Sequence, residues 1–271
     1  MKSSVICSTY NTPHFLSLVL DSLLHQNTHE FELIIADDGS TSETKQLIDG
    51  FKAKAPFPVN HLWHEDLGWR KSQIHNLAIS KVKFEHLIFI DGDCVLSPDF
   101  IQDHQKIAGQ EKKNFVLMGR RVELSEQITK ALSVDNYRKT LLSPLPLKLF
   151  LSGLTKESHG VFRRYSLNFA PLRRLLKADR VDDLLGCNFS LMRESMIQVN
   201  GFNDAVERGE DGDLFVRLRN TNHKLIGKKY YAVMFHLYHG RGNYQYVDDH
   251  YFELRKKQDY LRCEQGLASY L

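Results

Sequence analysis

Long apolar runs are absent from this sequence of 271 residues, and cysteine, proline and tryptophan are scarce. No stretch contains the roughly 18 consecutive apolar residues that a membrane-spanning helix requires. Residues 1–8 lack the apolar core of a secretory signal peptide, which predicts a cytoplasmic protein. Seven prolines are too few for a proline-rich linker architecture. The cysteines have no zinc-ligand spacing, so we expect four buried, reduced thiols: Cys7, Cys94, Cys187 and Cys263.

An overall excess of charge is also missing, because 36 Lys and Arg against 33 Asp and Glu leave a net charge of +3. This balance gives no indication of nucleic-acid binding. The charge is unevenly distributed: ten basic and two acidic residues between Arg138 and Arg180 give that segment +8, and the remainder −5. Apolar residues are interleaved with these cations. Two interpretations stay open, a surface for an anionic membrane or acceptor and a helical insertion with a solvated basic face.

The composition, 42% hydrophobic and 25% charged, is that of an ordinary globular protein. Short apolar runs alternate with helical patterns in the first part of the chain, and this alternation predicts an α/β fold with a mostly parallel sheet between two layers of helices. The expected strands are 4–8, 31–36, 59–63, 86–90 and 115–119, and the expected helices are 15–24, 42–54, 70–81 and 99–108.

The alternation fails after about residue 122 and resumes near residue 184. We therefore expect one domain in two parts, residues 1–121 and 184–241, separated by a basic, partly helical insertion over 122–183 and followed by a helical tail over 242–271. The second part should contain strands at 184–192 and 230–237, a helix at 193–199 and an amphipathic helix that begins near residue 210.

Acidic pairs follow two of the predicted strands. Asp91 and Asp93, with Gly92 between them, come directly after a buried strand. Carboxylates at such a strand end suit Mg²⁺ or Mn²⁺ and leave coordination positions for diphosphate oxygens. Asp37 and Asp38 end another strand and should lie at the same sheet edge, where ligands bind in folds of this kind. They form either a turn or an acceptor pair for a base or ribose.

Two further groups of candidate functional residues lie in the second part of the predicted domain, residues 184–241. Glu210 and Asp211 stand between glycines, where one carboxylate could act as general base while its neighbour holds a substrate hydroxyl. Acidic residues at a helix start also suit the helix dipole, which is the structural alternative. His236 and His239 follow an apolar strand and are candidate ligands for a divalent metal.

Taken in chain order, these motifs resemble the family 2 glycosyltransferases of the GT-A fold. The C-terminal part is similar to the galactosyltransferase and chondroitin-polymerase groups. The resemblance covers roughly residues 3–121 and 184–241, and the tryptophan and second glycine often found before Gly-Glu-Asp are replaced by Glu207-Arg208. The matching segments are 5–11, 31–40, 68–70 with Asn76, 91–93, 186–190, 201–203, 209–211 and His236.

The resemblance implies a role for each matching residue. Residues 1–121 would bind a UDP-sugar, with its uracil and ribose held by Thr9, Asn11 and either Asp37 or Asp38. Residues 184–241 would form the acceptor and catalytic half, with Asp211 as general base and Glu210 on the acceptor. The other implied donor-site residues are Arg70, Asn76, Asp91, Gly186 and Asn188. The implied ligands for Mn²⁺ or Mg²⁺ are Asp93, His236 and, as an alternative, His239.

The implied reaction is a single displacement that inverts the anomeric carbon. A hexose or N-acetylhexosamine would pass from a UDP-sugar to a hydroxyl of a glycan or glycolipid acceptor, such as lipopolysaccharide or a capsule chain. The basic segment 138–180 would then contact either the inner face of an anionic membrane or an anionic acceptor. A non-catalytic protein of the same fold that binds a sugar nucleotide or a membrane surface is the alternative.

Overall fold

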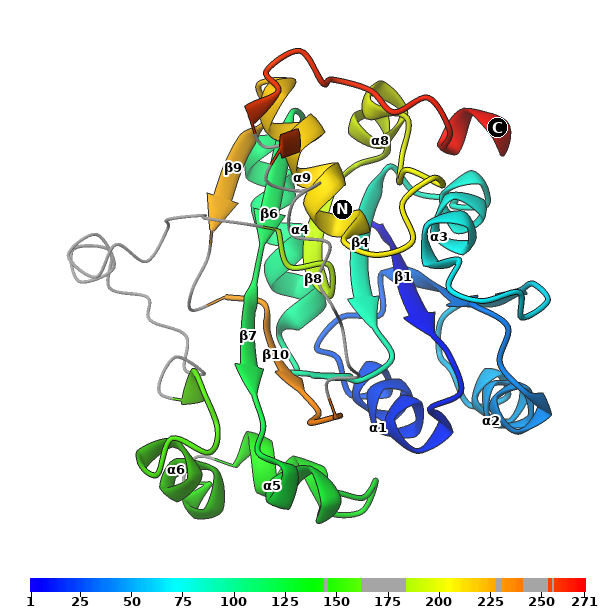
Figure 1. Cartoon of the computed structure of the whole chain (residues 1–271). Helices are drawn as coiled ribbons and strands as arrows, with labels where there is room; N and C mark the ends of the chain where they lie inside the picture. Colours follow the sequence, from blue (N-terminus) through cyan, green and yellow to red (C-terminus); the bar gives the residue numbers. More distant parts are fainter. Residues whose placement is uncertain (144–145, 162–183, 228–230, 241–252, 255) are drawn as a thin grey trace.

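The computed structural model describes residues 1–143, 146–161, 184–227, 231–240, 253–254 and 256–271 (Figure 1). Its centre is a seven-stranded sheet with strand order β3-β2-β1-β4-β8-β6-β9. Only β8 runs against its neighbours, β4 and β6, so the predicted mostly parallel sheet is confirmed. The strands are β1 (Ser3–Thr9), β2 (Phe31–Asp37), β3 (Val59–Trp63), β4 (His86–Asp91), β6 (Phe115–Met118), β8 (Asn188–Met192) and β9 (Lys224–Gly227).

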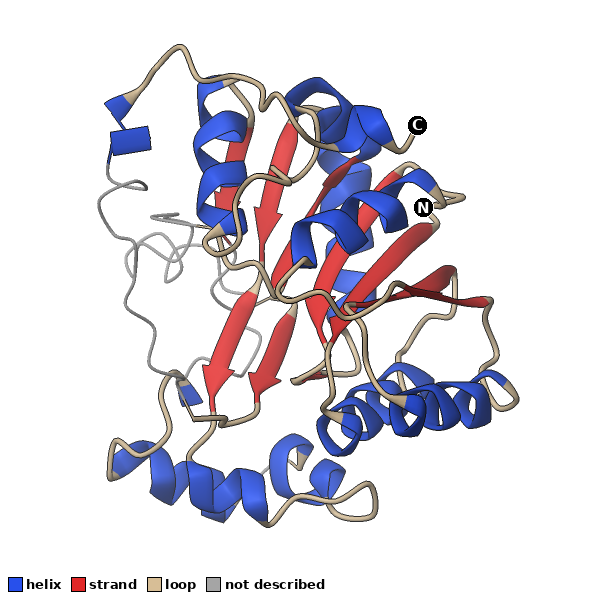
Figure 2. Cartoon of the chain, turned by 45° about the vertical axis from the view of Figure 1, so that its right-hand side comes forward, coloured by secondary structure: helices blue, strands red, loops and turns tan. Residues whose placement is uncertain are grey.

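Helices cover both faces of this sheet (Figure 2). Strands β1 and β2 are buried along their whole length, as expected for a parallel sheet that lies between two helical layers. One face packs on α1 (Pro13–Leu24), α2 (Ser42–Lys52) and α4 (Phe100–Glu111). The opposite face packs on α3 (Lys71–Ser80), α8 (Arg193–Val199) and α9 (Glu210–Asn220).

A second, three-stranded sheet was not expected from the sequence. Its order is β5-β10-β7, formed by β5 (Cys94–Leu96), β10 (Val233–His236) and β7 (Arg120–Glu123). Strands of three or four residues carry too little periodicity to be recognised, and their partners are distant in the chain. This sheet shapes the surroundings of the predicted metal ligand His236, because the register places His236 beside both Cys94 and Glu123.

The described part of the expected insertion packs on the main fold through α5 (Glu126–Lys130), η1 (Arg138–Leu142) and α6 (Leu147–Leu154). Tyr137, Leu141 and Leu149 are buried in a cluster that also contains Leu18 of α1 and Phe235 of β10. The arginines at 163, 164, 173 and 174 lie outside the described residues. None of the helices that the structure describes is long and apolar enough to cross a membrane.

Several expected boundaries change in the structure. The strand expected at 184–192 begins only at Asn188, because Gly186 and Cys187 form a turn in which Asn188 N donates to Leu185 O. The strand expected at 230–237 is shorter in the structure, where β10 contains only Val233–His236. Of the helical tail expected over 242–271, residues 242–252 and 255 lie outside the described residues. In the described part, residues 253–254 and 256 are helical and residues 257–266 are not. The short helix η3 (Leu267–Ser269) docks on the fold through Leu267 N and Asn200 O. All four cysteines are buried and free, as predicted.

A buried arginine of α9, paired with an aspartate of the same helix, fixes α9 to the end of α8 and the residues after it. The fully buried Arg217 guanidinium contacts Asp213 and donates to the carbonyl oxygens of Val199 and Gly201, at 2.6 and 2.7 Å. We expect Arg217→Met to lower the free energy of unfolding by about 3–5 kcal/mol, because Asp213 is then left buried without its partner. Urea denaturation measures the loss.

The matched control for this prediction is an exposed ion pair. Lys224 contacts Glu111 at 2.7 Å with most of its side chain in solvent, so Lys224→Met should cost less than about 1 kcal/mol. Equal losses for the two variants would contradict the assignment of Arg217 as a buried structural anchor.

Candidate active site

The carboxyl ends of β1, β2 and β4 meet at one edge of the large sheet. The register aligns Thr9 with Asp37 and Ser8 with Asp91, so the two acidic groups share the edge predicted for them. The hydroxyl oxygen of Thr9 is buried and has no hydrogen-bond partner among the described residues. An unsatisfied buried hydroxyl is costly, which makes this edge suited to a polar ligand.

Each carboxylate of the first acidic pair accepts hydrogen bonds from a histidine and a backbone amide. Asp37 accepts from His61 Nε2 at 2.8 Å and from Ser40 N at 2.8 Å. Asp38 accepts from His64 Nε2 at 2.6 Å and from Arg70 N at 3.0 Å. Sequence reasoning missed both histidines, because their positions depend on the pairing of β3, and the residue that follows it, with β2.

Asn11 and Arg70 border this pair. Asn11 has a φ of 46° and its Oδ1 accepts from Thr41 N at 2.9 Å, so it shapes the loop after β1. The Arg70 guanidinium contacts Glu65 O, while its Nε is buried and has no hydrogen-bond partner among the residues that the structure describes. Thr9, Asp38 and Arg70 therefore surround the same edge.

The second group unites Asp93, His236 and His239. One ligand atom from each lies within 4.8 Å of the others, as a divalent metal site requires. Asp93 Oδ2 is 3.6 Å from His236 Nε2 and 3.2 Å from His239 Nε2. One carboxylate and two imidazoles fit Mn²⁺ or Mg²⁺ with positions left open.

Glu123 orients His236 from the other side, since its Oε2 lies 2.9 Å from His236 Nδ1. Such a carboxylate fixes the ring so that Nε2 faces the metal position. Burial lowers the pKa of His236, but hydrogen bonds to Asp93 and Glu123 outweigh it and raise the pKa to about 10. Burial opposes ionisation of Asp93, yet the two histidines hold its pKa well below the usual range. Glu123 belongs to no motif, and sequence reasoning missed it.

Glu210 and Asp211 open α9 behind the left-handed Gly209. Asp211 accepts from Gly186 N at 3.2 Å and Gly212 N at 2.8 Å. Burial and then the neighbouring Glu210 raise the pKa of Asp211 to about 6, although Lys71 acts in the opposite direction. A carboxylate with such a pKa is ionised at neutral pH and basic enough to accept a proton in catalysis.

Lys71 connects the two halves of the site. Its Nζ lies 3.0 Å from Asp91 Oδ1 and 3.4 Å from Glu210 Oε1, and its side chain is only 15% exposed. Asp91 Oδ1 also accepts from Ser8 Oγ at 2.5 Å. Sequence reasoning missed Lys71. The available signal was a lysine at the first position of a helix, where the dipole disfavours a cation.

Three predicted donor-site residues contact other parts of the protein. Asn76 is fully buried, donates to Phe202 O at 2.8 Å and accepts from Phe202 N at 2.9 Å. Asn188 is fully buried and donates to Ala232 O at 2.9 Å. Gly186 stands so close to Asp211 that a Cβ would lie 3.0 Å from its Oδ2. The two asparagine side chains hold loops, and a donor-binding role for these three residues stays a prediction.

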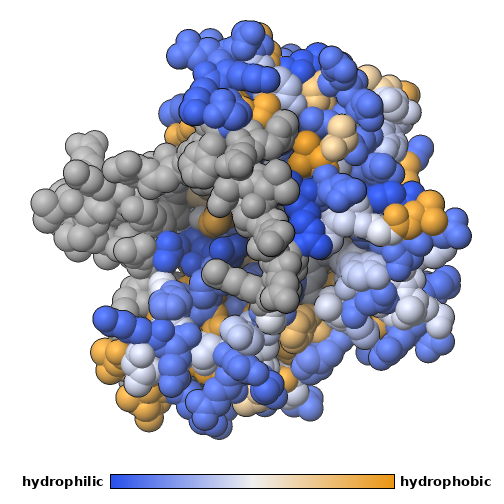
Figure 3. Space-filling model, in the orientation of Figure 1, coloured by the Kyte–Doolittle hydropathy of each residue, from blue (hydrophilic) through white to orange (hydrophobic). Residues whose placement is uncertain are grey.

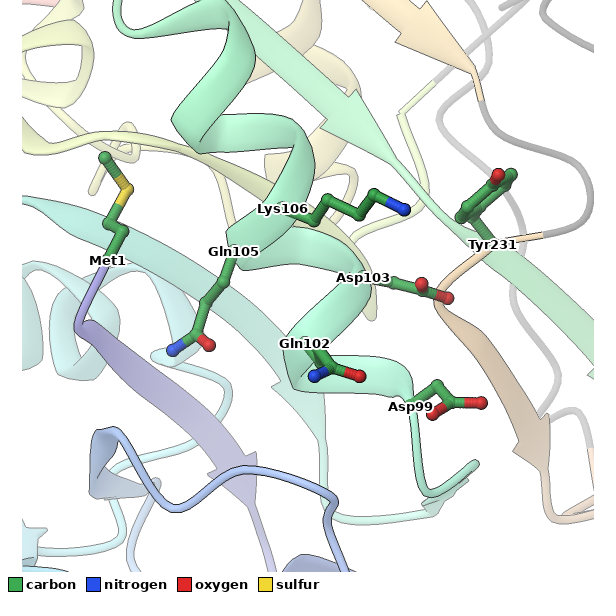
Figure 4. A pocket seen from close by; sticks show the side chains of 7 residues that line it. All are labelled: Met1, Asp99, Gln102, Asp103, Gln105, Lys106 and Tyr231. Carbon is green, nitrogen blue, oxygen red and sulfur yellow. The ribbon is translucent and has the colours of Figure 1, made fainter.

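A separate depression of about 550 Å³ lies along the outer side of α4 (Figure 4). It contains none of the predicted site residues. Asp103 in its wall accepts from Ala232 N at 2.8 Å and thus anchors the start of β10. Its lining is Met1, Asp99, Gln102, Asp103, Gln105, Lys106 and Tyr231.

A mostly parallel sheet with Asp-Gly-Asp at its carboxyl edge, histidines across from the second aspartate and a carboxylate pair opposite defines the GT-A class of nucleotide-sugar-dependent transferases. Comparison with known proteins gives the family. The model described as glycosyl transferase family 2 matches residues 4–197, and the chain belongs to this family. A second model, described as the N-terminal domain of galactosyltransferase, matches residues 172–240.

Two curated relatives illustrate the similarity. The chain is 27% identical over 171 residues to poly(ribitol-phosphate) beta-N-acetylglucosaminyltransferase TarS of Staphylococcus aureus, covering 60% of this chain and 30% of TarS. It is 28% identical over 126 residues to hyaluronan synthase of Pasteurella multocida, covering 46% of this chain and 13% of the synthase. The chain thus spans less than a third of either relative.

Solved structures share the fold. A crystal structure of S. aureus TarS with UDP-GlcNAc matches all of this chain and 69% of its own, at a TM-score of 0.63 and 15% identity. The mannosyltransferase PcManGT from Pyrobaculum calidifontis, with GDP-Man and Mn²⁺, matches at a TM-score of 0.58 and 15% identity. That match covers 89% of this chain and 58% of PcManGT.

Proposed function

We propose that this chain transfers a hexose or N-acetylhexosamine from a UDP-sugar to a hydroxyl of a glycan or glycolipid, with inversion at the anomeric carbon. The observation that carries the proposal is the contact of one ammonium with both halves of the site. Lys71 Nζ lies within 3.4 Å of the donor-side Asp91 and the acceptor-side Glu210. This contact supports a site in which donor-binding and acceptor-binding groups lie in one cluster.

The donor edge suits a nucleoside diphosphate sugar. The Thr9 hydroxyl and the Arg70 Nε are buried polar atoms without a hydrogen-bond partner in the described part of the chain, which supports a polar ligand at this edge. Asp38 is one of the two carboxylates proposed to contact uracil or ribose. The solved TarS and PcManGT complexes contain UDP-GlcNAc and GDP-Man. Their presence supports a donor of this chemical class.

Asp93, His236 and His239 are the residues proposed to hold Mn²⁺ or Mg²⁺. Imidazole ligands suit manganese better than magnesium. When bound, the cation neutralises negative charge on the leaving diphosphate. Glu123 keeps His236 oriented for this role.

In the proposed reaction, Asp211 accepts the proton of the acceptor hydroxyl. The acceptor oxygen forms a bond to the anomeric carbon as the bond from that carbon to the diphosphate oxygen breaks. The bonding electrons leave with UDP. Glu210 holds the acceptor, and the backbone amide of Gly186 keeps the Asp211 carboxylate in place.

The acceptor proposed is a cell-surface polymer, such as lipopolysaccharide or a capsule chain. By their names, TarS transfers N-acetylglucosamine to poly(ribitol-phosphate) and hyaluronan synthase makes hyaluronan. A non-catalytic sugar-nucleotide-binding protein of the same fold is the competing function.

Incubation with a panel of UDP-sugars and Mn²⁺, followed by measurement of released UDP, tests the proposal. Slow hydrolysis of one UDP-sugar, with water as acceptor, supports a transferase. Tight binding of UDP without turnover of any donor, in the presence of candidate glycans, would favour the binding protein instead.

We also propose peripheral contact with an anionic membrane through the surface around α6. Four apolar side chains at helical spacing, each 45–66% exposed, form one face of this helix: Leu147, Phe150, Leu151 and Leu154. Figure 3 shows apolar atoms gathered at this end of the molecule. The described residues 138–143 and 146–161, which include α6, contain four basic side chains and one acidic one, a balance that complements anionic lipids. In the sequence, the whole segment 138–180 has a net charge of +8.

The double substitution Phe150→Glu and Leu151→Glu should reduce cosedimentation with phosphatidylglycerol vesicles by about tenfold or more, because two exposed apolar side chains can no longer insert into the lipid and two added negative charges repel it. Ile197→Glu, on an exposed position of α8, is the control and should bind as the wild type does. Equal sedimentation of all three proteins would exclude α6 as the contact surface.

A further inference from the structure

The ion pairs of Lys71 join three elements that are separate in the chain. Asp91 ends β4, Glu210 begins α9, and Lys71 is the first residue of α3. We infer that Lys71 is a positioning residue that holds Asp91 and Glu210 in one arrangement, so that donor and acceptor are aligned for transfer. This inference rests on the proposed function.

Burial makes Lys71 dependent on these partners. An ammonium withdrawn from water loses hydration energy that only close, well-placed carboxylates restore. The start of α3 adds an unfavourable interaction with the helix dipole. A lysine whose ammonium pointed into solvent would not lose this hydration energy. The contacts with Asp91 and Glu210 therefore explain why Lys71 points inward.

The Lys71 ammonium, which forms a bridge between Asp91 and Glu210, also balances the negative charge of the carboxylates around it. Asp91, Glu210 and Asp211 would repel one another without the ammonium, and the start of α9 would be displaced from β4. Glu210 and Lys71 are the charged groups that act most strongly on Asp211, and Lys71 is the one that lowers its pKa. Loss of Lys71 should therefore raise the pKa of Asp211 above about 6.

The experiment compares Lys71→Met and Lys71→Arg in the full chain, with UDP-GlcNAc hydrolysis and calorimetric UDP binding in Mn²⁺ as readouts. If another UDP-sugar is the better donor, it replaces UDP-GlcNAc. For Lys71→Met we expect the rate of hydrolysis to fall about 100-fold, while the affinity for UDP stays within about twofold of wild type. The fall in rate at low pH, which reflects protonation of Asp211 (the acid limb of the pH profile), should shift to higher pH. Lys71→Arg should restore the acid limb in part, because it retains the charge. Lys83→Met, on an exposed lysine beyond α3, should match the wild type.

Two results would overturn the inference. A large loss of UDP affinity in Lys71→Met would make Lys71 a direct donor ligand, and an unchanged rate and pH profile would make it a structural cation alone. Failure of the wild type to turn over any donor would instead contradict the proposed function.

The bridge is then tested by thermal denaturation of Lys71→Met, Glu210→Gln and their combination. Paired groups give shifts that are not additive, because Lys71→Met costs less once Glu210 is neutral. Additive shifts would refute the bridge without reference to activity.

Discussion

Asp211→Asn should lower the rate of sugar transfer by about 10²- to 10⁴-fold and leave the affinity for UDP and Mn²⁺ unchanged. The amide has the shape of the carboxylate and can still accept a hydrogen bond from Gly186 N, but it cannot take a proton from the acceptor. A substitution that separates binding from turnover in this way identifies a general base.

Rates over a range of pH provide the sharper measurement. Wild-type activity should fall about tenfold per pH unit below the pKa of Asp211, which is about 6, since the protonated carboxyl is no longer a base. Activity should level off above that pH. Asp211→Asn should lack this limb, whereas Asp259→Asn, at an exposed position, should retain it. Transfer by Asp211→Asn at the wild-type rate would refute its role.

Asp93→Ala should abolish the dependence of UDP binding on Mn²⁺, with a loss of metal affinity greater than about 100-fold, because the carboxylate is the anionic ligand of the group. Removal of Mn²⁺ with a chelator should lower transfer by the wild type to the level of this variant. Titration of Mn²⁺ followed by calorimetry gives the affinity directly.

Glu123→Gln is a milder variant that tests the residue that orients His236. It removes the charge that orients His236 without removing a ligand, so the affinity for Mn²⁺ should fall by about 10- to 100-fold. Comparison of His236→Ala with His239→Ala decides how much each imidazole contributes. UDP binding that is equally tight with and without Mn²⁺ in all of these proteins would contradict the metal site.

Much of the fold could be predicted from local pattern. Parallel strands that are buried on both faces have continuous apolar sequences, and the carboxylates at their ends follow as motifs, which is why Asp37 and Asp91 were placed at one edge. The second sheet could not be predicted, since its short strands derive their identity from partners far along the chain. The same non-local pairing determines the positions of His61, His64 and Glu123.

Asn76 and Asn188 show the complementary limit of motif reasoning. A polar residue inside a family motif is readily assigned to the ligand, but both side chains are buried and bonded to backbone groups. Lys71 shows the opposite case. It belongs to no family motif that we used, yet it contacts carboxylates from both halves of the site.

The small sheet has a thermodynamic consequence. It places β10 between β5 and β7, so the proposed ligands of a cation come from segments of the chain that are far apart in sequence. The unfolded chain cannot hold Asp93 and two distant imidazoles together, and a cation that binds only the folded form stabilises it, by about 2.7 kcal/mol at a concentration one hundred times its dissociation constant. The free energy of unfolding would then rise with the concentration of available metal, so the same cation would support both the stability and the proposed catalysis of the chain.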